Sequence, residues 1–372
     1  IEGDFMTTDI NSGLEGVVVG ATRLSNVEGE IGRLTYRGEV VEELVKQPFA
    51  GVAYWLMTGE HPTEDQVGAL DLWLAAESEL TATELRLLEQ LPRTLHPMAV
   101  LQSVAPVANL TPNQPAPDFV SAQWQDGLVL AARLNGVVRV WHNLCTLGQV
   151  RVLPAGLGFL ETLLYGIQGQ KPSAEALGAI NATQILQLDH GFNAGTFAGR
   201  VIASTQGSLQ ASVAGSLGAL SGALHGGADE AAVIMAQTIG SPDQADAWVR
   251  DALANKVKIM GMGHREYKAL DPRAAILKPM ARQFCEGTEW ENLMETLVAV
   301  EDTCQSVFSE KGKEIHANLE FYKGAVYLAL GIPEQYFTSF FACSRVFGWV
   351  SHYHEFQTDA RLIRPRALYI GA

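Results

Sequence analysis

Three histidines stand in settings that favour chemistry at neutral pH. His190 lies in Leu-Asp-His-Gly-Phe-Asn, His225 in Ala-Leu-His-Gly-Gly-Ala, and His264 in Met-Gly-His-Arg-Glu-Tyr. A single histidine is more often structural than catalytic, but His225 follows an uncharged stretch and precedes a Gly-Gly step that opens a new helix. Backbone amides at that helix start would keep the imidazole neutral. We therefore predict that His225 is available as a hydrogen-bond donor.

Basic side chains gather in one segment of an acidic chain. With 41 Asp and Glu against 26 Lys and Arg, the net charge is −15, which disfavours an extended nucleic-acid or anionic-membrane surface. Residues 256–282, however, hold seven Lys or Arg and two acids. They surround a Gly-Met-Gly-His turn and an Asp-Pro-Arg helix start, where phosphates bind readily. We favour a phosphate-bearing ligand here over a merely solvated helix face.

Several familiar catalytic motifs are missing from the sequence. A dinucleotide fingerprint at residues 261–266 fails because Glu266 replaces the third glycine, and P-loop, esterase and zincin motifs are absent. We therefore expect no metal and no cofactor. The four cysteines lie far apart and predict buried free thiols in a reducing compartment. Because no basic region precedes an apolar stretch at the start, we expect a cytoplasmic protein without a secretory signal.

The elements that must position these residues are mainly helical. The 372 residues are 47% hydrophobic and 18% charged, enough for a large core. Residues 16–37 predict a β-hairpin, whereas apolar stripes beginning at Phe49, Leu293 and Ala325 predict helices. Residues 201–224 carry no charge and predict one buried helix, not a membrane span. Its glycines at positions 215, 218 and 222 would allow close approach of another helix or subunit.

An ordered series of motifs resembles the citrate synthase family, which includes 2-methylcitrate synthases, from about residue 13 to residue 371. The matching pieces are Gly-Arg-Leu-Thr-Tyr-Arg-Gly at 32–38, His-Pro-Met at 96–98, Asp-His at 189–190, Leu-His-Gly-Gly at 224–227, the segment 261–268, Asp-Pro-Arg at 271–273, the segment 318–324, Ser-Arg at 344–345, Gly-Trp at 348–349, and Arg-Pro-Arg at 364–366. The resemblance implies an all-α, two-domain homodimer with a small N-terminal β-hairpin. It places a large domain at residues 1–224 and 326–372, and a small domain at 225–325 that closes over the substrates.

The resemblance also implies a Claisen-type condensation of acetyl-CoA with oxaloacetate to citrate and CoA, with the thioester as a substrate rather than a cofactor. By matching motif, His225 would stabilise the enolate, His264 would protonate the ketone, and the residue at 320 would be the base. Oxaloacetate would be bound by His190, Arg273, Arg345 and, from the neighbouring subunit, Arg364. CoA would be bound by Lys258, Met260, Gly261, Gly263, Arg265 and Lys268.

One departure from the family pattern falls on the base itself. The family motif Asn-x-Asp-Phe-Tyr supplies an aspartate, whereas residues 318–322 read Asn-Leu-Glu-Phe-Tyr. Glu320 keeps the carboxylate but adds a methylene, and a displacement of about 1 Å can cost on the order of a hundredfold in rate. Further departures are Ala317 for proline, Lys323 for a small residue, Asp229 for asparagine, Gly195 for serine and Gln187 for histidine.

Other functions remain open at this point. Propionyl-CoA would make the protein a 2-methylcitrate synthase, and one methylene changes pocket affinity by only about 1–3 kcal/mol. The ending Arg-Pro-Arg-Ala-Leu-Tyr at 364–369 favours citrate synthase. A CoA-dependent enzyme with another oxoacid acceptor is a further alternative. So is a paralogue that has lost condensation, which the altered base favours and the retained histidines and arginines disfavour.

Overall fold

A short antiparallel sheet lies near the start of the described chain. The computed structural model describes residues 11, 13–14, 16–223, 225–358 and 361–371. Strands β1 (Ser25–Glu28), β2 (Arg33–Tyr36) and β3 (Glu39–Val40) pair in sequence order, with Val27 opposite Leu34. The predicted hairpin is therefore confirmed, and a third short strand extends it.

Helices form the rest of the described fold, which confirms the predicted all-α class. They are α1 (Val41–Leu44), α2 (Phe49–Thr58), α3 (Glu64–Glu77), α4 (Ala82–Gln90), α5 (Pro97–Val104), the 3-10 helix η1 (Ala105–Val107), α6 (Ala122–Thr146), α7 (Phe159–Gln168), α8 (Ala174–Ile185), α9 (Ala194–Ser204), α10 (Leu209–Leu220), α11 (Ala228–Ile239), α12 (Pro242–Ala254), α13 (Pro272–Cys285), α14 (Glu291–Ser309), α15 (Leu319–Ala329), the 3-10 helix η2 (Glu334–Tyr336) and α16 (Phe337–Gln357).

The predicted apolar stripes are the buried faces of these helices. Helix α14 buries Leu293, Leu297, Val300, Cys304 and Val307, one every three or four residues. Helix α2 ends at Gly59, which adopts the left-handed conformation that closes many helices. Periodicity therefore predicted these helices correctly.

The prediction of one helix over residues 201–224 is wrong. Helix α9 ends at Ser204, Gln206 adopts a positive φ of 63°, and α10 begins after its N-cap Ser208. The chain therefore folds back, and α10 packs on α9. The close approach expected at two glycines is present, because a Cβ at Gly215 would lie 2.2 Å from Ile202 and one at Gly218 would lie 2.5 Å from Gln102. Leu224 lies outside the described residues.

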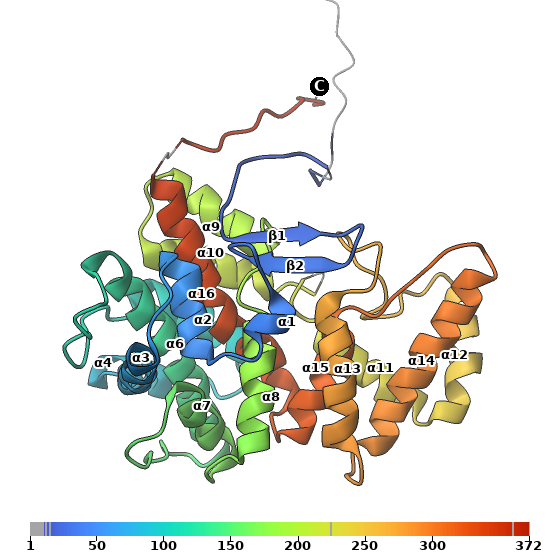
Figure 1. Ribbon diagram of the computed structural model, residues 1–372, viewed down its shortest axis with the longest axis horizontal. Helices are drawn as coiled ribbons and strands as arrows, with labels where there is room; N and C mark the ends of the chain where they lie inside the picture. Colours follow the sequence, from blue (N-terminus) through green and yellow to red (C-terminus); the bar gives the residue numbers. More distant parts are fainter. Residues whose placement is uncertain (1–10, 12, 15, 224, 359–360, 372) are drawn as a thin grey trace, which may run out of the picture.

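The helices form two groups that meet at the candidate site. Helices α2 to α10 and α16 gather on the left of Figure 1, with the long α6 and α16 buried and in contact at the centre. Helices α11 to α15 pack on one another at the right. The sheet crosses above the junction. The exact division into residues 225–325 and the remainder stays a prediction.

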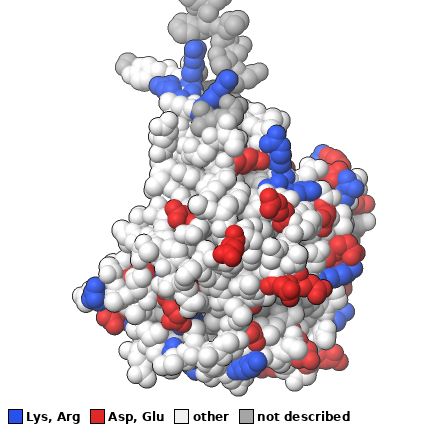
Figure 2. Space-filling model, turned by 60° about the vertical axis from the view of Figure 1, so that its left-hand side comes forward, with Lys and Arg blue, Asp and Glu red and all other residues white. Residues whose placement is uncertain are grey.

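Charged side chains are unevenly spread over the surface. On the face shown in Figure 2 they lie mainly toward the right and the lower part of the folded body, and a broad area carries few of either sign. All four cysteines are free; Cys285, Cys304 and Cys343 are buried as predicted, but Cys145 is exposed at the end of α6.

None of the described helices combines the length and the apolar character needed to cross a bilayer.

Candidate active site

The sheet anchors two of the three histidine loops. The hydroxyl of Ser25 in β1 donates to the Asp189 carboxylate and accepts from the backbone N–H of Gly191, so it holds both neighbours of His190. The turn after β1 holds the second loop, because the Gly29 carbonyl accepts from the backbone N–H groups of Lys268 and Ala269. The sheet therefore holds two segments side by side that follow it in the sequence by about 160 and about 240 residues.

The imidazoles of His190 and His264 lie close together around Tyr267. The ring centroids of the two histidines are 5.3 Å apart, and His190 Nε2 lies 3.2 Å from the Tyr267 hydroxyl. His264 Nδ1 accepts from the backbone N–H groups of Glu266 and Tyr267. A neutral His264 must then carry its proton on Nε2.

Arg273 presents a second donor beside that proton. Its Nη2 lies 3.4 Å from His264 Nε2, so two donors face the same space and suit one shared carbonyl or carboxylate oxygen. The guanidinium is held by Asp271, with Nε to Oδ1 at 3.0 Å and Nη2 to Oδ2 at 2.8 Å. Both side chains are buried. Asp271 also caps α13 and accepts from the Leu319 N–H, which ties Arg273 to the start of α15.

Glu320 lies in the first turn of α15, directly after the N-cap Asn318. The Asn318 side chain accepts from the Glu320 N–H and donates to the Gly263 carbonyl. Residues 261–263 pair with residues 316–318, since Gly263 N–H donates to His316 and Asn318 N–H donates to Gly261. This pairing links the His264 loop directly to the helix that carries Glu320.

Gly261 is required where that loop meets α15. Its φ is +76°, and an added Cβ would lie 2.7–3.0 Å from the Phe321 ring, Cβ and Cα. We expect Gly261→Ala to lower the free energy of unfolding by about 2–4 kcal/mol, from crowding and a disfavoured φ together. Gly240→Ala is the matched control, because Gly240 has φ +86° but no atom near its added Cβ. Urea unfolding of both variants checks this; equal losses would contradict the crowding argument.

Arg345 completes the basic side of the site. It lies in α16, fully buried, with its guanidinium over the Phe341 ring at 4.7 Å and its Nε donating to the Gln187 carbonyl. Burial and nearby Arg273 lower its pKa to about 10, while Asp189 opposes this, so the guanidinium stays charged at pH 7. Two buried guanidiniums without a full set of acids favour an anionic ligand.

His225 lies between α10 and α11, as the sequence predicted. Burial, and then the charge of Arg345, lower the pKa of the imidazole to about 4, although Glu320 opposes the shift. The imidazole is therefore neutral at pH 7, chiefly because of burial and not because of helix amides alone. Its buried Nε2 has no hydrogen-bond partner among the described residues. An unpartnered buried nitrogen in a polar site is suited to a ligand oxygen.

This lowered pKa predicts acid sensitivity. Between pH 6.5 and about 4 the unfolded chain binds a proton at His225 that the folded chain does not, so stability falls as pH falls. One such proton changes the unfolding free energy by at most about 1.4 kcal/mol per pH unit. His190 and His264 add to the trend, because burial lowers their pKa values too. Melting temperatures from pH 4.5 to 7.5 should fall less steeply in His225→Gln; parallel curves would contradict the assignment.

The structure does not bring all predicted residues to this place. Arg364 lies in the exposed C-terminal tail, which extends away from the helices in Figure 1, and its guanidinium donates to the adjacent Pro365 carbonyl. Of the predicted CoA residues, Lys258, Arg265 and Lys268 are exposed and Gly261 is buried. Met260 and Gly263 are partly buried.

Fewer cations of the basic segment 256–282 are available to a ligand than the sequence suggested. Among the described residues, at least four of its seven cations form ion pairs with acids: Lys268 with Glu30, Arg273 with Asp271, Lys278 with Glu301 and Arg282 with Glu295. Three of these acids lie outside the segment, so a charge count within it could not reveal the pairing. A phosphate site here therefore remains a prediction for the other cations.

Sequence reasoning missed several residues that shape the site. Tyr267 contacts His190, Asp271 holds Arg273, and a buried ion pair joins Lys323 to Asp229 at 3.0 Å. Asp271 could have been recognised from the Asp-Pro-Arg spacing, in which an N-cap carboxylate and an arginine two residues later can meet. Nothing in the local sequence pairs positions 229 and 323.

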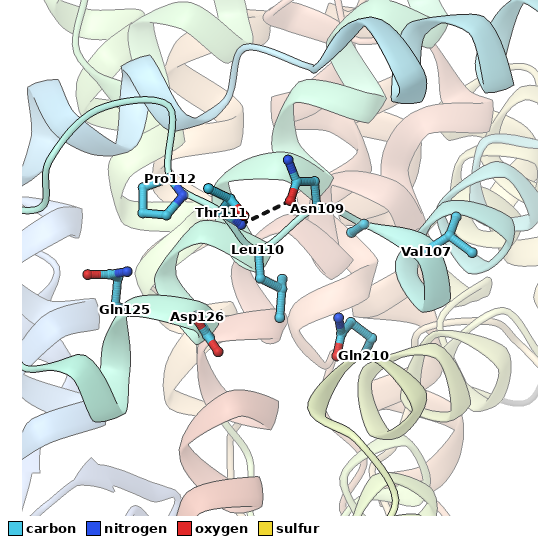
Figure 3. Close-up of a pocket in the computed structure, with 9 residues that line it drawn as sticks. Val107, Asn109, Leu110, Thr111, Pro112, Gln125, Asp126 and Gln210 are labelled. Atoms are coloured by element: carbon cyan, nitrogen blue, oxygen red, sulfur yellow. Dashed lines mark hydrogen bonds between the residues drawn. The ribbon is translucent and has the colours of Figure 1, made fainter.

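A separate open pocket carries none of this chemistry. It lies between η1, the start of α6 and α10, and is lined mainly by Val107, Asn109, Leu110, Thr111, Asp126 and Gln210 (Figure 3). It contains one acid and no histidine, arginine or lysine. The described residues also contain no group of three or more His, Cys, Asp or Glu placed to hold a metal ion.

Comparison with known sequences gives full-length matches. A family model described as citrate synthase, C-terminal domain, matches residues 13–366. A citrate synthase from Deinococcus radiodurans is 33% identical, with 98% of this chain and 97% of the relative covered. A 2-methylcitrate synthase from Mycobacterium tuberculosis is 34% identical, covering 98% and 91% respectively.

Solved structures match over the same span. Citrate synthase from Thermotoga maritima superimposes with a TM-score of 0.87 at 33% identity, covering 98% of this chain and 96% of the other. A ternary complex of carboxymethyl coenzyme A and oxaloacetate with citrate synthase from Thermoplasma acidophilum gives a TM-score of 0.88 at 30% identity, covering 98% and 97%.

Proposed function

Since this chain belongs to the citrate synthase family, whose enzymes transfer an acyl group by condensation, we propose that it joins acetyl-CoA to oxaloacetate and releases citrate and CoA. The observation that carries the proposal is the state of His225. Its imidazole is neutral, and its buried Nε2 has no hydrogen-bond partner among the described residues. The Glu320 carboxylate lies near enough to act on the pKa of this imidazole. A base and a neutral hydrogen-bond donor are the pair needed to form and stabilise an enolate.

The first step in this proposal is proton abstraction from the acetyl methyl group. Burial raises the pKa of Glu320, but Lys323, Arg273 and His264 outweigh it, so the pKa lies below its ordinary value and the carboxylate is ionised at pH 7. Glu320 takes the proton, and the electron pair of the C–H bond moves toward the thioester oxygen. His225 donates a hydrogen bond to that oxygen as negative charge develops.

Carbon–carbon bond formation follows. The enolate carbon attacks the ketone carbon of oxaloacetate, and the ketone oxygen takes the proton from His264 Nε2. The proton that Glu320 removed from the methyl group then returns to His264 through solvent, so both groups regain their starting protonation states. Arg273, Arg345 and His190 would bind the two carboxylates and orient the ketone, which suits their donors and positive charge. Water then hydrolyses the citryl thioester and releases CoA, so no resident cofactor is required.

The extra methylene of Glu320 is accommodated, in this proposal, by the position of its helix. Asn318, Gly261 and Asp271 all fix the first turn of α15 through hydrogen bonds from outside that helix. Small shifts in these contacts could place the longer carboxylate where an aspartate would otherwise act. A complex with oxaloacetate and a CoA analogue in which Glu320 turns away from the acyl carbon would contradict this.

The remaining assignments concern assembly and the CoA site. We infer a cytoplasmic homodimer, with the largely uncharged area of Figure 2 as a candidate contact surface and Arg364 of each tail reaching the oxaloacetate site of the other subunit. Helices α11 to α15 would move as the small domain.

The CoA site would use residues of the basic segment. The exposed Lys258 and Arg265 would bind the phosphates of CoA, together with Lys268 if it leaves Glu30. Met260, Gly261 and Gly263 would line the acyl end of the CoA thioester.

A second candidate is 2-methylcitrate synthase, favoured by the relative from Mycobacterium tuberculosis at 34% identity. Thiol release should be measured with acetyl-CoA and with propionyl-CoA, each with oxaloacetate, and the product identified by mass spectrometry. We expect a higher kcat/KM with acetyl-CoA and citrate as product. Preference for propionyl-CoA would assign the second function. No release with either, in protein that still binds oxaloacetate, would favour another acceptor or a loss of condensation.

A further inference from the structure

Lys323 is a fully buried cation directly behind the proposed active site. Its side chain has no exposed area, and its Nζ lies 3.0 Å from Asp229 Oδ2 and 3.0 Å from Gln187 Oε1. The ammonium also lies 4.3 Å from the centroid of the Phe341 ring. A buried ammonium is costly unless it is paired or hydrogen-bonded, and Lys323 has an ion-pair partner in Asp229 and a hydrogen-bond acceptor in Gln187.

The partners of Lys323 lie on the segments that carry the proposed catalytic and substrate-binding residues. Lys323 follows Glu320 by three residues on α15, so the two side chains are neighbours on one helix face. Asp229 follows His225 by four residues, in the first turn of α11. Gln187 precedes His190 by three residues, and its backbone carbonyl accepts from Arg345. One ammonium thus joins three separate segments.

Gln187 itself is held firmly. Its amide nitrogen donates to the Thr183 carbonyl at 2.7 Å and to the Tyr327 hydroxyl at 2.9 Å, which leaves its side-chain oxygen directed at Lys323. The amide orientation is therefore determined by its neighbours. Lys323, Asp229 and Gln187 are three of the departures from the family pattern, and Lys323 contacts both of the others. Their occurrence together agrees with one shared role.

Many charges act on Glu320, and Lys323 is prominent among them. The titratable or charged side chains around it are Lys323, Arg273, His264, Asp271, His225, Arg345 and Asp229. Burial acts most strongly and raises the pKa of Glu320; Lys323 is the leading opposing influence, ahead of Arg273 and His264. Asp229 shows the reciprocal effect, since burial raises its pKa and Lys323 opposes this.

We propose that Lys323 is a positioning residue for the condensation: its ammonium, held by Asp229 and Gln187 and three residues from Glu320 on α15, places a positive charge beside the Glu320 carboxylate and holds the Glu320, His225 and His190 segments in register. The role of Glu320 as base rests on the proposed function above. The charge effect on Glu320 does not, so the two can fail separately.

The test variant is Lys323→Met with Asp229→Asn, which removes the pair without leaving Asp229 as an orphaned acid. The pKa of Glu320 is followed by infrared titration of the protonated carboxyl band that disappears when Glu320→Gln is added to the same background. We expect the pKa to rise in the double variant, because the lost Lys323 charge acts on Glu320 more strongly than the lost Asp229 charge. Asp229→Asn alone should not raise it, because that change removes a negative charge.

Turnover supplies the second readout. A base must be ionised, so kcat/KM falls as pH drops through its pKa; raising that pKa moves the acid limb of the profile to higher pH. We expect this shift in the double variant, with oxaloacetate binding retained in calorimetry. Asp246→Asn with Arg250→Met, which removes an exposed ion pair on α12, is the matched control and should leave both readouts unchanged.

Each outcome separates the two proposals. Equal Glu320 titration in the wild type and the double variant would overturn the role of Lys323, whatever the activity. A raised pKa in protein that never releases thiol would support the charge effect and contradict the proposed function. If the double variant does not fold, Lys323→Gln with Asp229→Asn keeps a donor for Gln187 and serves the same titration.

Discussion

Glu320→Gln is expected to reduce kcat for thiol release by about 10³-fold or more. The amide keeps the shape of the carboxyl group but cannot accept the methyl proton, and removal of a general base typically costs 10²–10⁴-fold. Oxaloacetate binding should persist, because its proposed ligands, Arg273, Arg345 and His190, are unchanged. Steady-state kinetics with acetyl-CoA and calorimetric titration with oxaloacetate measure the two effects.

The variant Glu320→Asp tests whether the site is arranged for the longer glutamate side chain. If α15 is placed for the longer side chain, the shortened carboxylate is displaced by about 1 Å and kcat falls on the order of a hundredfold, less than for Gln. An equal or higher rate in Glu320→Asp would show that the site is still built for aspartate. Unchanged turnover in Glu320→Gln would exclude Glu320 as the base.

Arg273→Met is expected to abolish measurable oxaloacetate binding and to destabilise the fold by about 3–5 kcal/mol. The guanidinium forms an ion pair with the Asp271 carboxylate, and both groups are buried. The pKa of Asp271 lies below its ordinary value because Arg273 outweighs the effect of burial. Removing Arg273 leaves that charge uncompensated. Chemical denaturation and calorimetry are the measurements.

Asp271→Asn combined with Arg273→Met separates the two losses. The double variant has no buried charge to compensate, so we expect it to regain much of the stability while still failing to bind oxaloacetate. Recovery of binding in the double variant would mean that Arg273 acts only by neutralising Asp271. A stable Arg273→Met single variant would contradict the importance of the buried pair.

The sequence predicted the helical elements well where one periodic signal dominated. The stripes of α2, α14 and α15 follow from the spacing of their apolar residues. It failed at residues 201–224, where every residue is uncharged and no polar face marks a boundary. The break at Gln206 depends on α10 packing back onto α9, which is a tertiary contact.

By itself, the sequence also determined which residue types are available for chemistry. The Gly-x-Gly-His turn, the Asp-Pro-Arg helix start and the Leu-His-Gly-Gly step placed His264, Arg273 and His225 beside backbone suited to their roles. The substitution at position 320 could likewise be recognised from the motif alone. These are local properties, because capping, turn geometry and spacing involve residues only a few positions apart.

Only the tertiary structure decided how those residues are charged and held. Whether Arg345 stays ionised, and why His225 is neutral, depends on burial and on charges from other elements. The contact between Lys323 and Gln187 spans 136 residues of sequence. Because electrostatic energy depends on distance and desolvation in the folded state, no local pattern can contain it.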